Sequence, residues 1–277
     1  MIPYIFFGLI VLILVSLLLC VLYVLSTMCR RGHKGLHKLR GWAYAHRGLH
    51  GDGVPENSIE AFRRAKRAGY GVELDVHLLA DGNLAVFHDF VLDRMTDAKG
   101  YIEDLTTEQL KELYLSGTRH RIPTFEEVLA LFDGEVPIIV ELKCHKDNVS
   151  ALCEKTCNML DSYHGVYCIE SFDPRCVRWL RKNRPDLIRG QLTENYFHSK
   201  NAKIPLYLKF ALVHQMLNFL TLPDFVAYRF SDRKTFSNIL VEKLWGAKSV
   251  AWTLRTPEEY ALARQEGRIP IFEGFCP

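Results

Sequence analysis

The sequence predicts an α/β protein: a (β/α)8 TIM barrel with a small insertion after strand 3, preceded by one transmembrane helix. Eight short apolar segments alternate with helical segments along residues 41–277, and a domain of that length is typical of one barrel. An uncharged apolar stretch at the N-terminus predicts the helix. Strand number and chain length favour the closed barrel over an open, doubly wound sheet.

The N-terminal segment from Ile2 to Met28 carries no charged side chain. It exceeds the about 20 apolar residues that a helix needs to cross a bilayer. It also lacks the basic start, the short apolar core and the small-residue exit of a cleaved signal peptide, although a signal peptide and a buried core helix are the alternatives. We therefore expect a membrane anchor at residues 1–28, a basic juxtamembrane linker at 29–40 and a folded domain at 41–277.

Basic residues flank the anchor on one side only, because none precedes it and five follow it in the linker: Arg30, Arg31, Lys34, Lys38 and Arg40. Positive charge stays on the cytoplasmic side of a membrane, so we predict a single-pass protein with its folded domain in the cytoplasm. The eight cysteines include no CxxC pair, and free thiols are typical of a reducing compartment. The linker is either solvated or held at anionic headgroups. The net charge of +3 gives no indication of nucleic-acid binding.

Strands are predicted where short runs are rich in Val, Ile and aromatic residues. Helices are predicted at residues 58–68, at 124–132, which opens with the order of a capping box, and at 258–265. Residues 90–121 are too long for a simple loop and predict an insertion. The strand candidates are Trp42–His46, Gly71–His77, Asn83–His88, Pro137–Leu142, Gly165–Glu170, Leu187–Leu192, Asp224–Tyr228 and Lys248–Thr253.

Polar side chains gather where the first four predicted strands end. Reactive groups in a TIM barrel lie at the C-terminal ends of its strands, and alternate residues of one strand share a face. We therefore expect one shared mouth for two histidines, three carboxylates and two cations: His46, Arg47, Glu73, Asp75, His88, Glu141 and Lys143.

The three carboxylates predict a metal site. Glu73, Asp75 and Glu141 would repel one another if crowded, at about 4 kcal/mol for a pair at ~4 Å and an effective dielectric near 20. A divalent cation removes that cost, and oxygen ligands suit Mg²⁺ or Ca²⁺ better than zinc. The alternative is that the carboxylates pair with Arg47 and Lys143.

Such a site suits the cleavage of a phosphodiester, which needs charge neutralisation, a base and an acid. The metal and Arg47 can hold phosphate oxygens, because a guanidinium matches them in fork geometry. His46 and His88 can transfer protons, because imidazole titrates near neutral pH.

Six motifs in this order resemble the glycerophosphodiester phosphodiesterase family: HRG at 46–48, PENS at 55–58, ELDV at 73–76, DG at 81–82, HD at 88–89 and ELK at 141–143. The family is a TIM barrel with an insertion after its third strand. The resemblance implies that Glu73, Asp75 and Glu141 bind the metal and that His46 and His88 are the acid–base pair. It also implies substrate- or phosphate-binding roles near the metal for Arg47, Glu56, Lys143 and Trp252. The C-terminal IPIFEGFCP departs from the family pattern.

The implied activity is metal-dependent hydrolysis of glycerophosphodiesters to glycerol 3-phosphate and an alcohol, on water-soluble or on lipid-like substrates. Two alternatives are a phospholipase-D-like lyase that stops at a cyclic phosphate and an inactive membrane adaptor.

Residues 204–222 are unusually apolar, with Lys209 and His214 as their ionisable groups. We predict that this segment is a hydrophobic lip against lipid that admits single-chain glycerophospholipids; the alternative is an ordinary sixth barrel helix packed inward.

Overall fold

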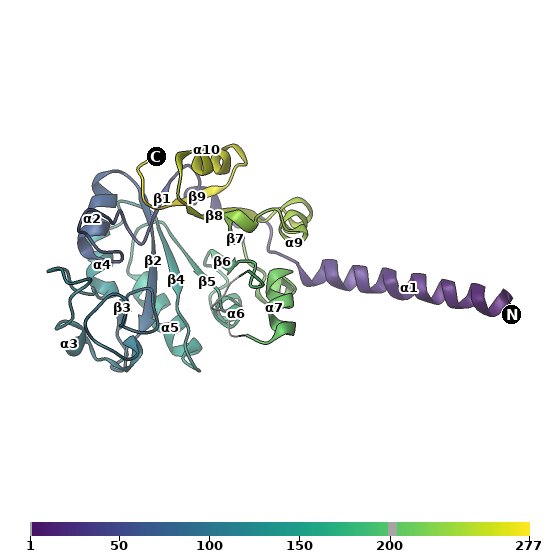
Figure 1. The fold of residues 1–277 in the computed structure, drawn as a ribbon, viewed down its shortest axis with the longest axis horizontal. Coiled ribbons are helices and arrows are strands. Elements are labelled where there is room, and N and C mark those ends of the chain that lie inside the picture. The colour runs from purple at the N-terminus through teal and green to yellow at the C-terminus, as the bar shows by residue number, and fades with distance from the viewer. Residues whose placement is uncertain (1, 199–203) are drawn as a thin grey trace.

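Eight parallel strands close into a barrel in the computed structural model, which describes residues 2–198 and 204–277 (Figure 1). The barrel closes because the first strand pairs with both the second and the last. The predicted barrel is therefore confirmed. Its strands are β1 (Tyr44–His46), β2 (Gly71–Leu78), β4 (Ile138–Leu142), β5 (Tyr167–Ser171), β6 (Arg189–Thr193), β7 (Phe225–Arg229), β8 (Lys248–Leu254) and β9 (Ile269–Phe272).

Helices cover the outside of the barrel between successive strands. Hydroxyl groups cap three of them, because the side chains of Ser58, Thr124 and Thr256 accept hydrogen bonds from backbone N–H groups in the first helical turn. The cap at Thr124 is the one that the capping-box order predicts. The full set is α2 (Ile59–Arg67), α4 (Phe125–Phe132), α5 (Val149–Asp161), α6 (Pro174–Asn183), α7 (Leu206–Val213), α8 (Asn218–Thr221), α9 (Phe236–Leu240), a π-turn at Val241–Trp245 and α10 (Pro257–Gln265).

The third predicted strand is not a barrel strand. The segment forms β3 (Leu84–Val86), which pairs antiparallel with the end of β2 outside the ring of eight. Asp81 and Gly82 form the turn, and Gly82 has a φ of +79°. An Asp-Gly pair between two apolar runs is a strong hairpin signal, and it explains why the chain reverses here instead of crossing over.

The eighth barrel strand is β9, which the sequence prediction left out. It is only four residues long and contains Pro270, so it lacks the usual strand signature. All four of its residues are buried, and it lies between β8 and β1. The helix α10 therefore connects β8 to β9, and the unusual C-terminal sequence completes the barrel.

The insertion after β3 is confirmed as a small substructure. It contains a 3₁₀ turn at Ile102–Asp104, the short helix α3 (Thr107–Leu110) and bridges that join Val91 to Tyr101 and Tyr114 to Arg121. It has its own apolar cluster, which includes Leu92, Ile102, Leu110 and Leu115. The insertion, which includes α3, lies at the end of the barrel where the strands terminate, because β2 and β3 extend beyond the barrel (Figure 1).

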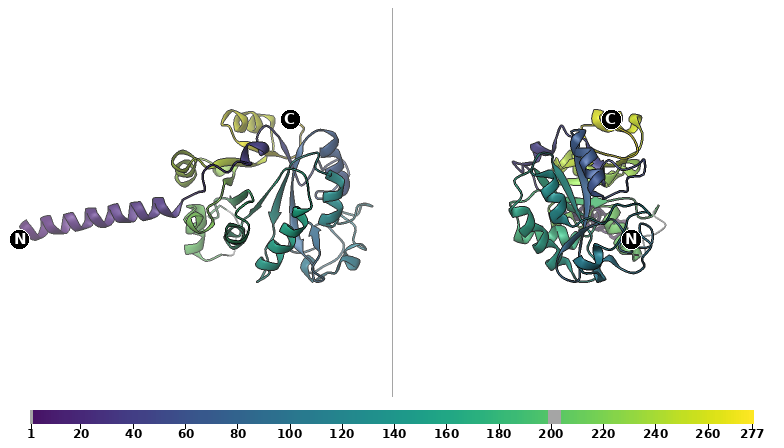
Figure 2. Two further views of the ribbon diagram at one scale, coloured as in Figure 1. Left: turned by 180° about the vertical axis from the view of Figure 1, so that it is seen from behind. Right: turned by 90° about the vertical axis from the view of Figure 1, so that its left-hand side faces the viewer.

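The N-terminal helix α1 (Ile2–Ser26) projects from one side of the barrel (Figure 2). Residues Tyr4–Ser26 are long and apolar enough to cross a membrane, and none of that stretch is buried against the protein. Its C-terminal end contacts the barrel through Tyr23, whose ring lies 6.4 Å from the rings of His214 and Phe236. The helices α7 and α9 therefore lie on the side from which α1 emerges (Figure 1).

The linker at residues 29–40 packs against the barrel and is not a free, solvated tether. Arg30 donates hydrogen bonds of 2.6 and 2.5 Å to the two carboxylate oxygens of Asp224 and one of 2.8 Å to the carbonyl oxygen of Leu187. Leu39 is buried and accepts a hydrogen bond from the hydroxyl group of Tyr44. The linker thus joins α1 to the barrel through several fixed contacts.

Replacing Arg30 should loosen this joint. Arg30→Ala leaves the buried Asp224 carboxylate without its bidentate partner, which we expect to destabilise the barrel by about 3 kcal/mol and to lower Tm by roughly 6–12 °C. The measurement is thermal unfolding of the full chain in nanodiscs. Lys38→Ala, at an exposed position of the same linker, is the control and should change stability by less than ~0.5 kcal/mol. Equal effects of the two changes would contradict the fixed joint.

Candidate active site

Strands β2 and β4 bring the three predicted carboxylates together. Glu73 and Asp75 lie two residues apart on β2, and Glu141 is the direct partner of Asp75 on β4. One carboxylate oxygen of each lies within 4.8 Å of the others, and all three side chains are buried. The strand register alone thus places this triad at one point of the barrel mouth.

The triad carries more negative charge than its surroundings balance. Burial, together with the nearby Asp75 and Glu141 carboxylates, raises the pKa of Glu73 well above its usual range. Burial raises the pKa of Glu141 to about 7 although Lys143 opposes the change. Asp75 is buried as well, but Lys143 holds its pKa well below the usual value. Three hard oxygen donors in this state fit a divalent cation of the Mg²⁺ or Ca²⁺ type.

Two cationic side chains border the triad, so the alternative of carboxylate–cation pairing is partly realised. The Nζ atom of Lys143 lies 2.9 Å from Asp75 and 2.5 Å from Glu141. The Nη1 atom of Arg47 donates to Glu56 at 2.9 Å, and its Nε atom lies 3.6 Å from Asp75. Two cations therefore border three carboxylates, and a divalent cation could supply the positive charge that would ionise all three.

Arg47 is held in place by its backbone. Its φ is +55°, which is uncommon for a residue with a side chain. Its N–H group donates to the carbonyl oxygen of Glu73 at 2.9 Å. The buried Nε atom has no hydrogen-bond partner in the described part of the chain. That atom faces the Asp75 carboxylate at 3.6 Å without a hydrogen bond, so the backbone of Arg47 holds its guanidinium beside the triad.

Each predicted catalytic histidine is paired with a carboxylate. The Nδ1 atom of His46 lies 2.5 Å from Glu273, and the Nδ1 atom of His88 lies 2.6 Å from Asp89. The hydrogen bond from His46 lowers the pKa of Glu273 to about 2 against the effect of burial, and His88 and Arg94 likewise lower the pKa of Asp89. Ionised carboxylates only accept hydrogen bonds, so both histidines carry their proton on Nδ1.

This arrangement leaves the Nε2 atom of each histidine free for proton transfer. In His46 that atom lies 3.9 Å from Glu73 and therefore faces the triad. Burial lowers the pKa of His46 to about 4, so its imidazole is neutral at physiological pH. In each pair the carboxylate can orient the imidazole ring and can stabilise it once the ring is positively charged, as general acid–base catalysis requires.

The insertion contributes a residue that sequence reasoning missed. Arg94 donates to Glu56 at 2.6 and 3.1 Å and to Asp89, the partner of His88, at 2.5 and 3.1 Å. Glu56 is thus placed beside the triad through Arg47 and Arg94 and is not one of its three members. Nothing in the local sequence around Arg94 distinguishes it from an ordinary surface arginine.

Three further residues of the site were also missed. Glu273, the partner of His46, follows the unrecognised strand β9. Glu170 ends β5 beside Glu141, and burial raises its pKa well above the usual range; the rule of reading strand ends would have found it. Asn57 donates a 2.8 Å hydrogen bond to Asp75 from within the PENS motif.

Aromatic rings form one wall of the mouth. The ring of Trp252, at the end of β8, lies 5.4 Å from that of Phe172, and the Phe172 ring lies 6.5 Å from that of Tyr196. Burial, together with the Glu141 carboxylate, raises the pKa of Tyr196. Trp252 also donates to the carbonyl oxygen of Ala227 and lies beneath the guanidinium of Arg229. Trp252 is therefore fixed in the aromatic wall beside Phe172.

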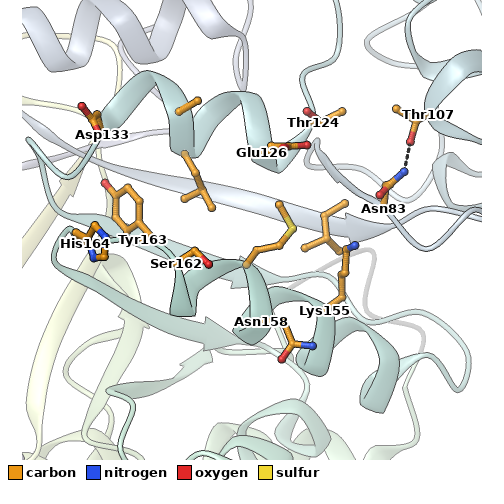
Figure 3. Close-up of a pocket in the computed structure, with 14 residues that line it drawn as sticks. Asn83, Thr107, Thr124, Glu126, Asp133, Lys155, Asn158, Ser162, Tyr163 and His164 are labelled. Carbon is orange, nitrogen blue, oxygen red and sulfur yellow. Dashed lines mark hydrogen bonds between the residues drawn. The ribbon is translucent and has the colours of Figure 1, made fainter.

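A separate pocket of about 660 Å³ lies between α4 and α5 (Figure 3). Its lining includes Leu129, Met159 and Tyr163 but none of the triad, the histidines or the aromatic wall. This pocket is not part of the barrel mouth, so residues beside it can serve as controls for substitutions at the mouth.

The fold and the site define a class: a barrel that gathers carboxylates, cations and paired histidines at the C-terminal ends of its strands has the arrangement of a barrel enzyme's active site. A model of the glycerophosphoryl diester phosphodiesterase family matches residues 46–273, and the chain belongs to that family.

Proteins that are similar to this chain in sequence or in fold include several phosphodiesterases. The glycerophosphodiester phosphodiesterase of Caldanaerobacter subterraneus is 37% identical over 158 residues, 53% of this chain and 65% of that protein, slightly under two thirds of its length. Glycerophosphodiester phosphodiesterase 1 of Homo sapiens is 29% identical over 243 residues, 78% of this chain and 72% of that protein. An Oleispira antarctica phosphodiesterase, solved with the product sn-glycerol-3-phosphate, shares the fold with a TM-score of 0.70, 22% identity, and coverage of 86% and 94% of the two chains.

Neutralising one carboxylate of the triad should remove metal binding without harming the fold. Glu73→Gln keeps the shape and removes repulsion, so the metal-free variant should be at least as stable as the wild type. Divalent metal at about 100 times Kd should stabilise the wild type by about 2.7 kcal/mol and the variant much less. Thermal unfolding with Mg²⁺, with Ca²⁺ and with a chelator measures both effects.

The control for this comparison is Glu126→Gln, at an exposed position on α4. It should respond to metal as the wild type does. Equal stabilisation of the Glu73→Gln protein by metal would show that the cation binds elsewhere.

Proposed function

We propose that this protein hydrolyses glycerophosphodiesters to glycerol 3-phosphate and an alcohol, with a divalent metal at the triad and His46 and His88 as the acid–base pair. The observation that carries the proposal is the geometry of the mouth. A buried carboxylate triad, the Arg47 guanidinium and two histidines that are each held by a carboxylate at Nδ1 converge there. Family membership supports the choice of a glycerol-based diester as substrate.

Glu73, Asp75 and Glu141 would hold the metal. When bound, the cation neutralises the phosphate and makes the phosphorus atom easier to attack. Arg47 and Lys143 add positive charge on the same side, and a guanidinium can contact two phosphate oxygens at once. These groups are fixed before substrate arrives, so little reorganisation is needed as negative charge develops.

The histidines would move the protons. In the first step the glycerol 2-hydroxyl oxygen forms a bond to phosphorus while the bond from phosphorus to the alcohol oxygen breaks. One histidine, in its neutral form, accepts the hydroxyl proton on Nε2, and the other, which enters the step as an imidazolium, donates its Nε2 proton to the departing oxygen. Water then opens the cyclic phosphate with the two roles exchanged, which restores both histidines. Glu273 and Asp89 stabilise the imidazolium state of their partners through the Nδ1 hydrogen bonds.

Removing either histidine should cost two or more orders of magnitude. His46→Ala and His88→Ala should each lower kcat by roughly 10²–10⁴-fold, the usual contribution of general acid–base catalysis. Release of glycerol 3-phosphate from glycerophosphocholine measures this. His164→Ala, an exposed histidine beside the separate pocket, is the control. Losses below tenfold in both variants would indicate a different acid–base pair, and a persistent cyclic phosphate in the wild type would identify a lyase.

We further propose that α1 anchors the protein as a single-pass membrane protein with the barrel in the cytoplasm. The support is an apolar helix that makes contact with the barrel only near its end, basic residues on the barrel side alone and cysteines that are all free. One of these basic residues, Arg30, is already hydrogen-bonded to Asp224 of the barrel. Arg31 likewise donates hydrogen bonds to the carbonyl oxygens of Leu244 and Trp245. Lys34, Lys38 and Arg40 are exposed and available to anionic headgroups.

Topology can be read directly with a reporter at the C-terminus of the full chain. A reporter that is active only in the cytoplasm should be active, and one that works only outside should be silent. Moving the basic residues of the linker to the N-terminal side of α1 should weaken this preference. An active external reporter on the unaltered chain would overturn both the orientation and the interpretation of the free cysteines.

A further inference from the structure

Exposed apolar side chains gather on α7, α8 and α9, the helices on the side of the barrel from which α1 emerges (Figure 1). Three of them, Leu206, Tyr207 and Phe236, are 72%, 75% and 68% exposed, which is far more than a helix packed on a barrel requires. Large apolar surfaces of this kind mark contact with a protein or a membrane. We call this surface the apolar collar, and it consists of Leu206, Tyr207, Phe210, Phe219, Phe236 and Ile239.

The helix α7 is apolar on two sides. On its inner side Leu208 and Leu212 are half-buried and Val213 is buried, and the hydroxyl group of Tyr228 on β7 donates a 3.3 Å hydrogen bond to the carbonyl oxygen of Val213. A helix that covers a barrel needs one apolar stripe, yet the three collar residues of α7 are exposed. The segment 204–222 therefore combines the two alternatives that the sequence leaves open, because its inner side packs on the barrel and its outer side has the exposed apolar character of the predicted lip.

Aromatic contacts join the collar to α1. The ring of Tyr23 stacks on the ring of Phe236, with 6.4 Å between their centroids and 17° between their planes. The ring of Tyr23 also lies 6.4 Å from that of His214, and the His214 ring lies 4.3 Å from that of Phe210. A continuous series of rings thus connects the end of α1 to both α7 and α9.

These contacts set the depth of the collar relative to a membrane that α1 crosses. The stretch Tyr4–Ser26 has 23 residues, which at about 1.5 Å each span about 34 Å, slightly more than the ~30 Å of a hydrocarbon core. Tyr23 is close to the end of that stretch, so its ring and the collar rings beside it lie at the boundary between hydrocarbon and headgroups. Trp245 donates a 3.0 Å hydrogen bond to Thr27 at the same level, and Tyr and Trp side chains are typical of the membrane interface.

The charges around the collar also suit a lipid surface. Residues 204–222 contain no acidic residue, and residues 233–246 contain one, Glu242. Arg268 donates hydrogen bonds of 2.6 and 3.3 Å to the Glu242 carboxylate, which balances its charge within the protein. The same two segments contain three lysines: Lys209, Lys234 and Lys243. Apolar side chains among lysines are typical of segments in the membrane interface, whereas a second copy of this chain would bring lysines against lysines.

We propose that the apolar collar docks the barrel on the membrane that α1 crosses, with the collar side chains at the boundary between hydrocarbon and headgroups. This inference rests on the proposed anchoring by α1 and adds a lateral contact between the barrel and the lipid. Because α1 leaves the barrel from its side (Figure 2), the docked barrel lies on its side against the bilayer. The collar thereby fixes the tilt of the barrel relative to the membrane.

Brominated lipids quench tryptophan fluorescence at short range and can therefore locate the collar. Phe210→Trp and Phe236→Trp place a reporter on α7 and on α9 of the full chain, reconstituted at one copy per phosphatidylcholine nanodisc. Lipid brominated near the headgroup end of its acyl chains should quench about half or more of the added fluorescence at each position. The matched control is Tyr114→Trp, an exposed aromatic position of the insertion, whose helix α3 lies on the far side of the barrel from α1 (Figure 1). Its added fluorescence should fall by less than about a tenth.

A reporter within α1 separates failure of the docking from failure of the anchor. Leu12→Trp, near the middle of α1, should be quenched by lipid brominated near the ends of its acyl chains. If Leu12→Trp is quenched but either collar position is not, the collar does not dock on lipid and the anchor stands. If Leu12→Trp is not quenched, the proposed anchoring is overturned. A single copy per nanodisc excludes coverage of the collar by a second copy, so quenching at both collar positions identifies lipid as the partner.

A measurement on the wild type makes the result independent of how the variants fold. In the same nanodiscs, a lipid that carries a photoreactive diazirine near its headgroup should crosslink to peptides from residues 204–222 and 233–246 as well as to the end of α1. Peptides from the insertion should remain free of crosslinks. Crosslinks confined to α1 would overturn the docking of the collar.

Discussion

The crowding of three carboxylates in a buried mouth is the constraint on which the site depends. The register of β2 and β4 sets Asp75 directly beside Glu141, and the two-residue repeat of β2 adds Glu73 on the same face. Water is excluded there, so repulsion between the charges is strong. Lys143 relieves it at Asp75 but not at Glu73, whose pKa stays well above normal. A divalent cation would complete this balance, and the strands hold the three carboxylates that would bind it.

The residues that position the groups around the triad come from segments that lie far apart in the sequence of the domain. Glu273 reaches His46 from the last strand, and Asp89 reaches His88 from the start of the insertion. Arg94 then ties Asp89 to Glu56, so the insertion and the first βα loop are joined over the mouth. Closure of the barrel by β9 is therefore a requirement for the site as well as for stability, because it delivers the carboxylate that orients one of the two histidines.

The sequence predicted the barrel, the insertion and the apolar helix because each leaves a long, regular pattern. It also brought together His46, Glu73, Asp75 and Glu141, since residues at the ends of parallel strands must meet. The sequence prediction failed where a strand or turn was short, and where interacting residues lie far apart in the sequence. The Asp81–Gly82 turn reversed a strand that was assigned to the barrel, and β9 was too short and too rich in proline to be recognised. Arg94 and Glu273 act across 38 and 227 positions of sequence, and no local pattern marks such partners.

The central claim is that the carboxylate triad works as a divalent metal site for phosphodiester cleavage. The most direct measurement is a phosphorus NMR time course of glycerophosphocholine with the full chain, first freed of metal by a chelator and then resupplied. The account predicts that no glycerol 3-phosphate forms with the metal-free protein and that its signal grows once Mg²⁺ or Ca²⁺ is restored. Undiminished turnover by the metal-free protein would contradict it.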